Sequence, residues 1–359
     1  MSSWGGAYPR IARWLGVGFE AKAIAYDSVL IDGPPNVETT GFVSKVGLGC
    51  GRARWALPAL ARYLRESQPS VTLIQPAAIA ILGIVAGKLA NTPVIPWEST
   101  VASLDVAEVP LHIRPYRVLE RVAYRGVPAV AAVSADVMTD LRANLGDRFH
   151  KPLDVIANPI DGDEVRRLAT PAARKTGRFR IVAVGRLNGQ KGFDVLVRAM
   201  ALATSRLKSD WEVLIVGDGP DRESLEELVQ QERLEERIQL LGWMDNPYNL
   251  MASADLFVHP ARWEGFSITV GEALALGLPV IGTNSPGATR SMLDGVGTVV
   301  EAGDPHDLCD AIVALESSPA ERERLGSAAM RRSDDFAPHH VASLLTKWLS
   351  GLGLLDRRP

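Results

Sequence analysis

Short runs of β-branched and other apolar residues alternate with longer amphipathic segments along residues 180–316. The runs predict strands at residues 180–184, 212–216, 238–241, 256–259, 279–282 and, as a short last strand, 298–300. The segments between them predict helices at residues 193–205, 221–232, 268–276 and 305–316. Strands that alternate with helices indicate βαβ units, so we expect a parallel sheet flanked by helices.

The first half of the chain shows the same alternation less regularly. Its apolar runs predict strands at residues 71–75, 93–96, 130–134 and 154–157. Helices are expected near residues 57–66, 77–90, 115–125 and 135–145. A turn at Asn158 and Pro159 precedes a charged segment, residues 162–178, that carries no strand pattern. We therefore predict two α/β domains, residues 1–160 and 161–335, followed by an amphipathic helix within residues 336–359.

Composition supports a two-domain globular protein. The chain has 359 residues, of which 47% are hydrophobic and 23% charged. The most apolar segment, residues 77–90, is shorter than the about 20 residues that a membrane-spanning helix needs. The amino terminus lacks the pattern of a secretory signal, and Cys50 and Cys309 form neither a disulfide framework nor a metal-ligand cluster. A cytoplasmic location is expected.

Positive charge is concentrated in the first domain. Residues 1–160 carry a net charge of +3 and the remainder −6. Four arginines share one predicted helix face: Arg114, Arg117, Arg121 and Arg125. A solvated helix face is the favoured interpretation, and contact with a membrane or an anionic acceptor is the alternative.

The segment GRLNGQKG, residues 185–192, follows a predicted buried strand and precedes a helix. Such a loop can present backbone N–H groups to an anion, and here it also supplies two cations, Arg186 and Lys191. An arginine can bind two phosphate oxygens at once while a lysine adds a point charge. A diphosphate site is one interpretation, and a surface loop with two ordinary basic residues is equally compatible with this segment alone.

Residues 217–220, GDGP, begin like a dinucleotide fingerprint, but Arg222 stands where that motif requires a small residue. We interpret Gly217 as part of a tight strand-to-helix turn that lets the backbone approach a ligand, and NAD binding is not expected.

A third segment, WEGFSITVGEALALG at residues 263–277, places two glutamates eight positions apart. Glu264 is expected in a loop and Glu272 on the first turns of the following helix, whose start can bind phosphate. One carboxylate could accept hydrogen bonds from a sugar and the other from a ribose. For this segment alone, a helix-capping glutamate and a chance spacing explain the pattern better.

Together these motifs resemble one family. The order GR-x-x-x-x-KG, VGDGP, LLGWMDN, ADLFVHPARWEGF and GLPVIGTNSPG is similar to that of the retaining glycosyltransferases of GT-B fold, family four type, which include many bacterial polysaccharide and lipid-glycan enzymes. The resemblance covers residues 155–350. It implies an α/β GT-B architecture, in which two Rossmann-like domains with parallel sheets face each other across a cleft and the last helix packs back on the first domain.

The resemblance also implies roles for matching positions. Arg186 and Lys191 would hold the donor diphosphate and stabilise the leaving group, Glu264 would contact donor sugar hydroxyls, and Glu272 the ribose. Further donor-binding positions would be Gly6, Gly217, Trp243, Met244, Gly265, Phe266, Ser267 and Ile268.

The implied reaction moves a hexose or N-acetylhexosamine from a nucleotide sugar, most similar to UDP-sugar enzymes, to a glycan or lipid-linked acceptor with retention. The donor phosphate would help to take the acceptor proton. No metal and no cofactor are expected, and Asp161-Gly162-Asp163, although it spells D-x-D, is interpreted as a linker.

Two features depart from the family. Only four residues precede the glycine loop at Gly5 and Gly6, too few for the first strand, while a following strand fits at residues 23–26. A misassigned start or a truncated chain is favoured over a domain built around a gap. In addition, Glu98 and Ser99 stand where many relatives carry a histidine. Both are acceptor-side candidates, with a plain loop as the alternative, and His259 is not expected to substitute for that histidine.

Other functions stay open on the sequence alone. A degenerate transferase kept as a nucleotide-sugar-binding partner protein is one. A nucleotide-sugar epimerase of the same fold ranks lower, because those enzymes lack the paired glutamates in this context. Peripheral contact with the inner face of the membrane is a further alternative, and no nucleic-acid partner is expected.

Overall fold

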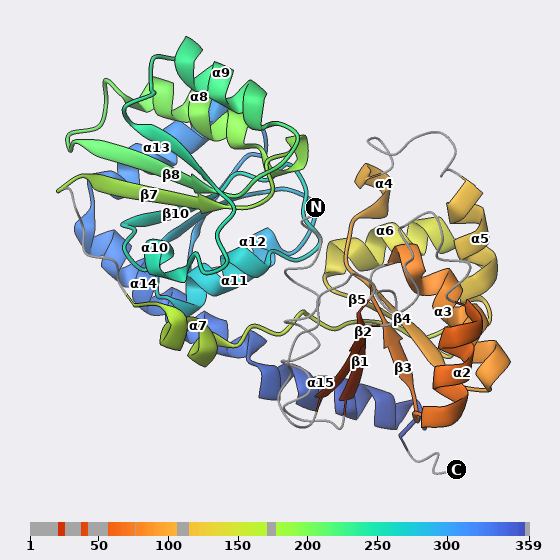
Figure 1. Cartoon of the computed structure of the whole chain (residues 1–359). Helices are drawn as coiled ribbons and strands as arrows, with labels where there is room; N and C mark the ends of the chain where they lie inside the picture. The colour runs from red at the N-terminus through yellow and green to blue at the C-terminus, as the bar shows by residue number, and fades with distance from the viewer. Residues whose placement is uncertain are drawn as a thin grey trace. The chain divides into compact units, whose positions relative to one another are not determined.

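The computed structural model describes residues 21–25, 37–41, 57–75, 77–105, 115–170 and 177–355. Contacts divide the chain into two units, Met1–Pro159 with Pro338–Pro359, and Ile160–Ala337 (Figure 1). The glycine loop at Gly5 and Gly6 lies outside the described residues, as does Arg114.

A six-stranded parallel sheet forms the centre of the C-terminal unit. In chain order its strands are β7 (Phe179–Val184), β8 (Trp211–Val216), β9 (Ile238–Gly242), β10 (Leu256–His259), β11 (Val280–Thr283) and β12 (Thr298–Val300). In space the order is β9-β8-β7-β10-β11-β12, and every neighbouring pair is parallel. The chain therefore winds outward in one direction from β7 and then in the other from β10, as in a doubly wound fold. The predicted parallel α/β architecture is confirmed.

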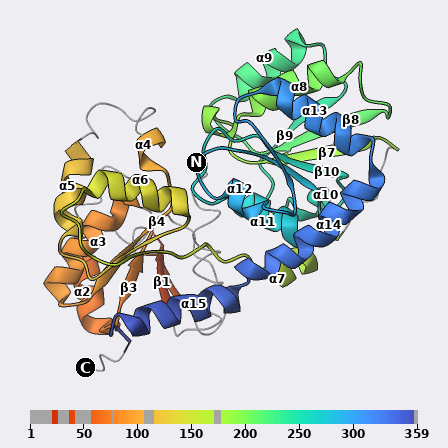
Figure 2. The same ribbon diagram turned by 180° about the vertical axis from the view of Figure 1, so that it is seen from behind.

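A helix follows each of these strands, one more helix precedes the first strand, and another follows the last helix of the alternation. They are α7 (Gly162–Leu168), α8 (Phe193–Ala203), α9 (Arg222–Gln231), α10 (Tyr248–Met251), α11 (Ile268–Ala275), α12 (Thr289–Met292), α13 (Pro305–Glu316) and α14 (Pro319–Ser333). Figure 2 shows α8 and α13 together on one side of the sheet, and contacts join these two helices. The other side carries α11, which contacts α14.

The segment that showed no strand pattern contains helix α7. The Asp161 carboxylate caps it by accepting a hydrogen bond from the Glu164 N–H at 2.9 Å, and Asp163 pairs with Arg166 at 2.8 Å. Both aspartates of the D-x-D sequence are thus engaged by the helix itself, because an N-terminal carboxylate satisfies donors that have no partner within a helix.

Burial on both faces explains why the sequences of the central strands are continuous apolar runs. All six residues of β8 are buried, as are the first five of β7, because helices cover both faces of a central parallel strand. Ile181, Val213 and Ile215 pack in one cluster with Leu196 and Ile312 from the covering helices. The sheet is therefore rigid where its strands end and the following loops begin.

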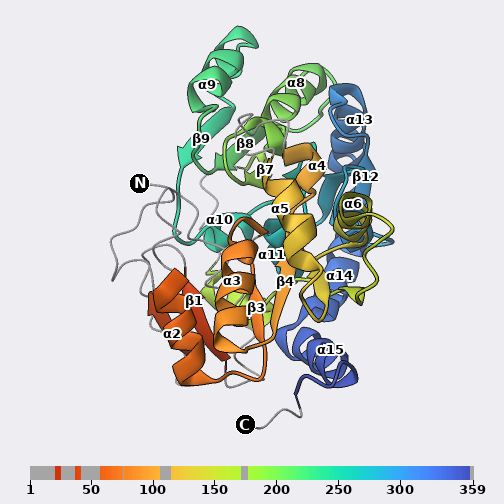
Figure 3. The same cartoon turned by 90° about the vertical axis from the view of Figure 1, so that its right-hand side faces the viewer.

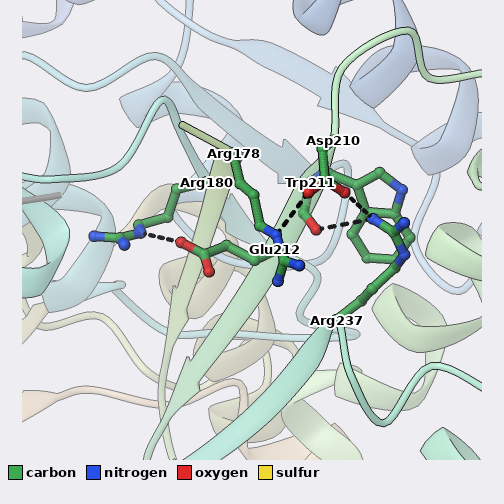
Figure 4. A network of polar contacts seen from close by, with 6 residues as sticks. All are labelled: Arg178, Arg180, Asp210, Trp211, Glu212 and Arg237. Carbon is green, nitrogen blue, oxygen red and sulfur yellow. Dashed lines mark hydrogen bonds and ion pairs between the residues drawn. The ribbon is translucent and has the colours of Figure 1, made fainter. Parts of the chain in front are cut away.

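One buried ion pair joins the amino-terminal ends of β7 and β8. Arg180 and Glu212 are register partners, their side chains are 9% and 7% exposed, and Nε donates to Oε1 at 2.7 Å (Figure 4). Close by, Asp210 accepts hydrogen bonds from Arg178 and from Arg237, whose guanidinium lies over the Trp211 ring. This network stabilises the strand ends opposite to the loops that follow β7 and β10.

The described residues of the N-terminal unit form two parallel sheets. One has the order β3-β4-β5-β6, formed by β3 (Thr72–Ile74), β4 (Val94–Glu98), β5 (Val130–Ala132) and β6 (Leu153–Val155), and the other pairs β1 (Ala21–Ala25) with β2 (Val37–Gly41). Its helices are α2 (Leu57–Ser67), α3 (Ala77–Ala90), α4 (Ala102–Asp105), α5 (Pro115–Tyr124), α6 (Ala135–Leu145) and α15 (Pro338–Gly351). Strand β4 extends two residues beyond the predicted 93–96, which places Glu98 inside the strand.

Candidate functional site

The loops that follow β7 and β10 leave the sheet at the same place. These two strands are neighbours, although 73 residues separate Lys191 of the first loop from Glu264 of the second, and the strand order reverses between them. Ligands of doubly wound sheets bind at the carboxyl ends of the strands at such a reversal. The topology therefore brings GRLNGQKG and WEGF, which are far apart in the sequence, to one edge.

Hydrogen bonds join these two loops. The Arg262 N–H donates to the Gln190 carbonyl at 2.8 Å, and the Gln190 side chain donates to the Trp263 carbonyl at 3.1 Å. Gly192 has a φ of 65°, and a β-carbon there would lie 2.1 Å from the Pro260 carbonyl oxygen. Only glycine fits this turn. The close approach of Gly192 to Pro260 therefore places the preceding residue, Lys191, next to the second loop.

Lys191 and Glu264 form the centre of the candidate site. The Lys191 ammonium contacts Oε2 of Glu264, and the two side chains are 18% and 13% exposed. Burial by itself would raise the pKa of Glu264, but the Lys191 charge and the nearby imidazole of His259 outweigh it and lower this pKa to about 2. A carboxylate that stays charged and points at a cation can accept hydrogen bonds from hydroxyl groups.

His259, the last residue of β10, is the part of this cluster that sequence reasoning missed. Its side chain is 3% exposed and Nε2 lies 3.5 Å from Oε2 of Glu264. Burial lowers the pKa of His259, and the Lys191 charge acts in the same direction. The available signal was its position at the end of a buried strand directly before the WEGF loop, because strand ends of this sheet face the ligand side.

The loop that follows β11 holds the main chain of Glu264 in place. Its N–H donates to the Pro286 carbonyl at 2.9 Å. Gly287 has a φ of 132°, and a β-carbon there would lie 1.4 Å from the Glu264 carbonyl oxygen. The SPG turn, residues 285–287, therefore holds Glu264 in place rather than serving only as a connection.

Helix α11 begins directly after this loop. Ser267 is its N-cap and accepts a hydrogen bond from the Val270 N–H at 3.3 Å. Phe266 is buried, and its ring packs edge to face against Phe336 with centroids 5.5 Å apart. The amino end of α11, where Ile268 is the first residue, is thus held rigidly beside Glu264, and its positive end favours an anion there.

Glu272 lies on the second turn of α11 and is 1% exposed. Its carboxylate accepts a hydrogen bond from the Tyr248 hydroxyl at 2.8 Å. Tyr248 is the first residue of the short helix α10. The hydroxyl orients this carboxylate, and a role toward a ribose stays a prediction.

Gly217, the first glycine of the GDGP turn, packs closely against the neighbouring backbone. Gly217 has a φ of 144°, and a β-carbon there would lie 1.8 Å from the Gly185 carbonyl oxygen. Its N–H donates to the Gly242 carbonyl at 2.9 Å, which joins the ends of β8 and β9. Trp243 and Met244 follow and are 57% and 38% exposed, so both present apolar surface at the same sheet edge.

Two predicted site residues have different surroundings from the Lys191–Glu264 pair. Arg186 is exposed at the start of the first loop. Glu98 lies in the other unit, where it is 3% exposed and accepts a hydrogen bond from Tyr124. Glu98 ends strand β4 rather than lying in a loop, while Ser99 follows the strand and is partly exposed, and an acceptor-side role for either residue stays a prediction. Burial, and then the Glu120 charge, raise the pKa of Glu98 to about 8.

Within the described part of the chain, no group of three or more His, Cys, Asp or Glu side chains is arranged to hold a metal ion. Among the same residues no helix combines the length and hydropathy needed to cross a bilayer.

Comparison with known proteins assigns the family. The family model of glycosyl transferases group 1 matches residues 166–332. The lipopolysaccharide core biosynthesis glycosyltransferase LpsD of Rhizobium meliloti is 30% identical over 301 residues, which are 81% of this chain and 78% of LpsD. The chain belongs to the glycosyl transferases group 1 family.

A second relative of this glycosyltransferase is N-acetylgalactosamine-N,N'-diacetylbacillosaminyl-diphospho-undecaprenol 4-alpha-N-acetylgalactosaminyltransferase of Campylobacter jejuni. It is 29% identical over 203 residues, which cover 56% of this chain and 54% of that protein. The match thus spans only about half the length of this relative.

Solved structures show the same fold. Sucrose-phosphate synthase from Thermosynechococcus elongatus superposes with a TM-score of 0.78 at 18% identity, over 96% of this chain and 92% of that one. Anabaena Alr3699/HepE in complex with UDP gives a TM-score of 0.76 at 19% identity, over 98% and 97%. The chain therefore has the GT-B fold, as its motifs predicted.

Proposed function

We propose that this glycosyltransferase moves a hexose or N-acetylhexosamine from a UDP-sugar to a glycan or lipid-linked acceptor, with retention of anomeric configuration and without a metal ion. The observation that carries the proposal is the contact between Lys191 and Glu264 beside the amino end of α11. A cation, a carboxylate and a helix start at one sheet edge match the diphosphate and the sugar hydroxyls of a nucleotide sugar.

In this proposal the basic and the acidic residues bind different parts of the donor. Lys191, together with Arg186 from the same loop, stabilises the negative charge that grows on the diphosphate as the glycosidic bond breaks. Glu264 accepts hydrogen bonds from sugar hydroxyls, and Glu272 from the ribose. An oxocarbenium-like transition state and proton transfer from the acceptor to the departing phosphate make a protein base unnecessary.

The remaining donor contacts would come from the neighbouring loops. The backbone N–H groups of residues 265–268 would serve the sugar and phosphate at the amino end of α11, and the exposed side chains after β9 offer a surface for the base. Support for UDP comes from the Anabaena structure, which contains UDP, and support for a lipid-linked acceptor from the undecaprenol named for the Campylobacter relative.

The test combines ligand screening with turnover. Purified protein is screened by thermal shift against UDP, GDP and ADP, and the stabilising nucleotide is then supplied as labelled nucleotide sugars, with and without EDTA. We expect UDP to stabilise most, EDTA to leave transfer unchanged, and the anomeric coupling in NMR to match that of the donor.

Three results would count against parts of the proposal. A product of inverted anomeric configuration would contradict the retaining mechanism. Loss of transfer in EDTA would contradict metal independence, and stabilisation by GDP alone would contradict the UDP assignment. UDP affinity without turnover would favour the alternative of a nucleotide-sugar-binding partner protein.

A further inference from the structure

The Nε2 atom of His259 is a buried polar atom without a hydrogen-bond partner among the residues that the structure describes. The side chain is 3% exposed, and Nε2 lies 3.5 Å from Oε2 of Glu264. A hydrogen bond between nitrogen and oxygen usually measures about 2.7–3.2 Å, so the two atoms are neighbours that are not yet bonded. An unpaired polar atom in a buried position is unfavourable, and such atoms often mark a functional contact.

Lys191 occupies the oxygen that His259 faces. The Lys191 ammonium contacts Oε2 of Glu264, the same atom that lies 3.5 Å from the imidazole. In the proposed function this ammonium also binds the donor diphosphate, so carboxylate and diphosphate compete for one cation. A carboxylate as buried as that of Glu264 is strongly destabilised when its cation leaves and nothing replaces it.

Of these three side chains, Lys191 is the one that can move most freely, because its ammonium sits on a flexible four-carbon stem. His259 ends strand β10 and is the register partner of Gly282 in β11. The main chain of Glu264 is held by its hydrogen bond to the Pro286 carbonyl. Imidazole and carboxylate therefore keep their places when the ammonium turns to a diphosphate.

The second glutamate of the site is already oriented by a neutral donor. Glu272 is 1% exposed and accepts a hydrogen bond from the Tyr248 hydroxyl at 2.8 Å. The two residues come from α11 and α10, which lie side by side (Figure 3). Burial lowers the pKa of His259, so its ring is neutral at neutral pH and can carry its proton on Nε2, as a donor of the same kind.

We propose that His259 is a positioning residue, which donates a hydrogen bond from Nε2 to Glu264 when the donor diphosphate draws Lys191 away. The inference rests on the proposed function, because a bound diphosphate is what competes for Lys191. The new hydrogen bond keeps the carboxylate paired and directed at the sugar. His259 acts through Glu264 and not on the substrate itself, since its own side chain is almost fully covered by the protein.

The experiment measures the affinity for UDP by titration calorimetry, or for the nucleoside diphosphate that the thermal-shift screen selects in its place. His259→Leu removes the donor, so UDP binding would leave the Glu264 carboxylate without a partner, and the affinity should fall about tenfold. His259→Gln offers an amide N–H in place of the imidazole N–H and should restore most of the affinity.

A second pair of variants separates positioning from packing. In H259L/E264Q, residue 264 carries no charge that Lys191 could leave unpaired. The loss caused by His259→Leu should therefore shrink from about tenfold to about twofold when it is measured against E264Q alone. A histidine that only fills space would cause the same loss in both backgrounds, because packing does not depend on the charge of residue 264.

His306→Leu is the matched control, at an exposed histidine of the same unit, and should bind UDP like the natural chain. Circular dichroism and the melting temperature check that each variant is folded. Nitrogen-15 NMR of histidine keeps the test valid if His259→Leu does not fold. UDP should shift the Nε2 resonance of His259 in the natural chain, and that resonance is identified by its absence from H259Q.

The outcomes separate this inference from the proposed function. Natural UDP affinity in H259L overturns the role of His259, because Lys191 would then bridge carboxylate and diphosphate. An equal loss in both backgrounds, or an Nε2 resonance that UDP does not shift, overturns it as well. In all three cases the proposed function stands. A natural chain that binds none of UDP, GDP and ADP contradicts the diphosphate site itself, and the inference fails with it.

Discussion

Lys191 and Glu264 contact each other across 73 residues of chain because strands β7 and β10 are neighbours in the sheet. The contact neutralises a cation and an anion that are both largely buried. It also defines where a diphosphate and a sugar would meet, since each side chain binds one of these groups in the proposed function.

Lys191→Ala should reduce transfer roughly a hundredfold or more, because in the proposed function the developing diphosphate charge would lose one of its two cations. Glu264→Gln should cause a loss of similar order through the sugar hydroxyls. Initial rates with the preferred donor measure both. Lys208→Ala, at an exposed lysine in the same unit, is the control and should keep the rate. Full activity of either site variant contradicts the assignment.

Glu98→Gln should make stability less dependent on pH. The pKa of Glu98 rises from 4.5 to about 8, so between these values the folded chain holds a proton that the unfolded chain has released. The free energy of unfolding of the natural chain therefore falls as pH rises through this window. The variant, which keeps an acceptor for Tyr124, should gain relative stability at pH 8 compared with pH 5.

Urea unfolding at the two pH values measures this difference. Glu66→Gln, at an exposed carboxylate of α2, serves as the control and should give a curve parallel to that of the natural chain. A parallel curve for Glu98→Gln as well would show that Glu98 is not protonated in the fold.

Glu212→Ala should lower the free energy of unfolding by about 3–5 kcal/mol, because it leaves the Arg180 guanidinium buried without its carboxylate. Replacing both residues, as R180M/E212L, should recover much of this loss. UDP affinity should change little in the double variant, since the pair lies at the opposite strand ends from Lys191. Asp310→Asn, which removes an exposed partner of Arg206, should cost less than about 1 kcal/mol.

Gly287→Ala should disturb Glu264 directly. A β-carbon at residue 287 would meet the Glu264 carbonyl oxygen, and the φ of 132° strains any other residue. Transfer should fall at least about tenfold, together with the melting temperature. Gly177→Ala, where nothing lies within 4 Å of the new β-carbon, should behave like the natural chain. Unchanged kinetics in G287A would show that this turn does not position Glu264.

His259→Gln should remove one acid-sensitive component of stability. Burial places the pKa of His259 below 6.5, so under acidic conditions the folded chain binds fewer protons than the unfolded chain. The free energy of unfolding therefore falls as pH drops below about 6.5, and the variant should lose less over that range. Unfolding between pH 5 and 7.5 measures it. His306→Gln, at an exposed histidine, should retain the dependence of the natural chain.

The sequence by itself determined the local elements of the C-terminal unit. The strands at residues 256–259 and 298–300 and the helix at 305–316 have the predicted bounds, because continuous apolar runs and capped amphipathic segments are local signals. It also indicated Arg186, Lys191 and Glu264 as one set, but through the order of motifs in a family rather than through their chemistry alone. The roles of the site residues stay predictions.

Tertiary structure decided what no local pattern contains. His259 and Tyr248 join the two glutamates only because strand order and helix placement bring them there. Gly217 and Gly287 prove to be required by close approach to Gly185 and Glu264. Glu98 moves from an expected loop to a buried strand end. These relations depend on contacts between distant segments, and the packing of the whole sheet fixes such contacts while the residues on either side along the chain do not.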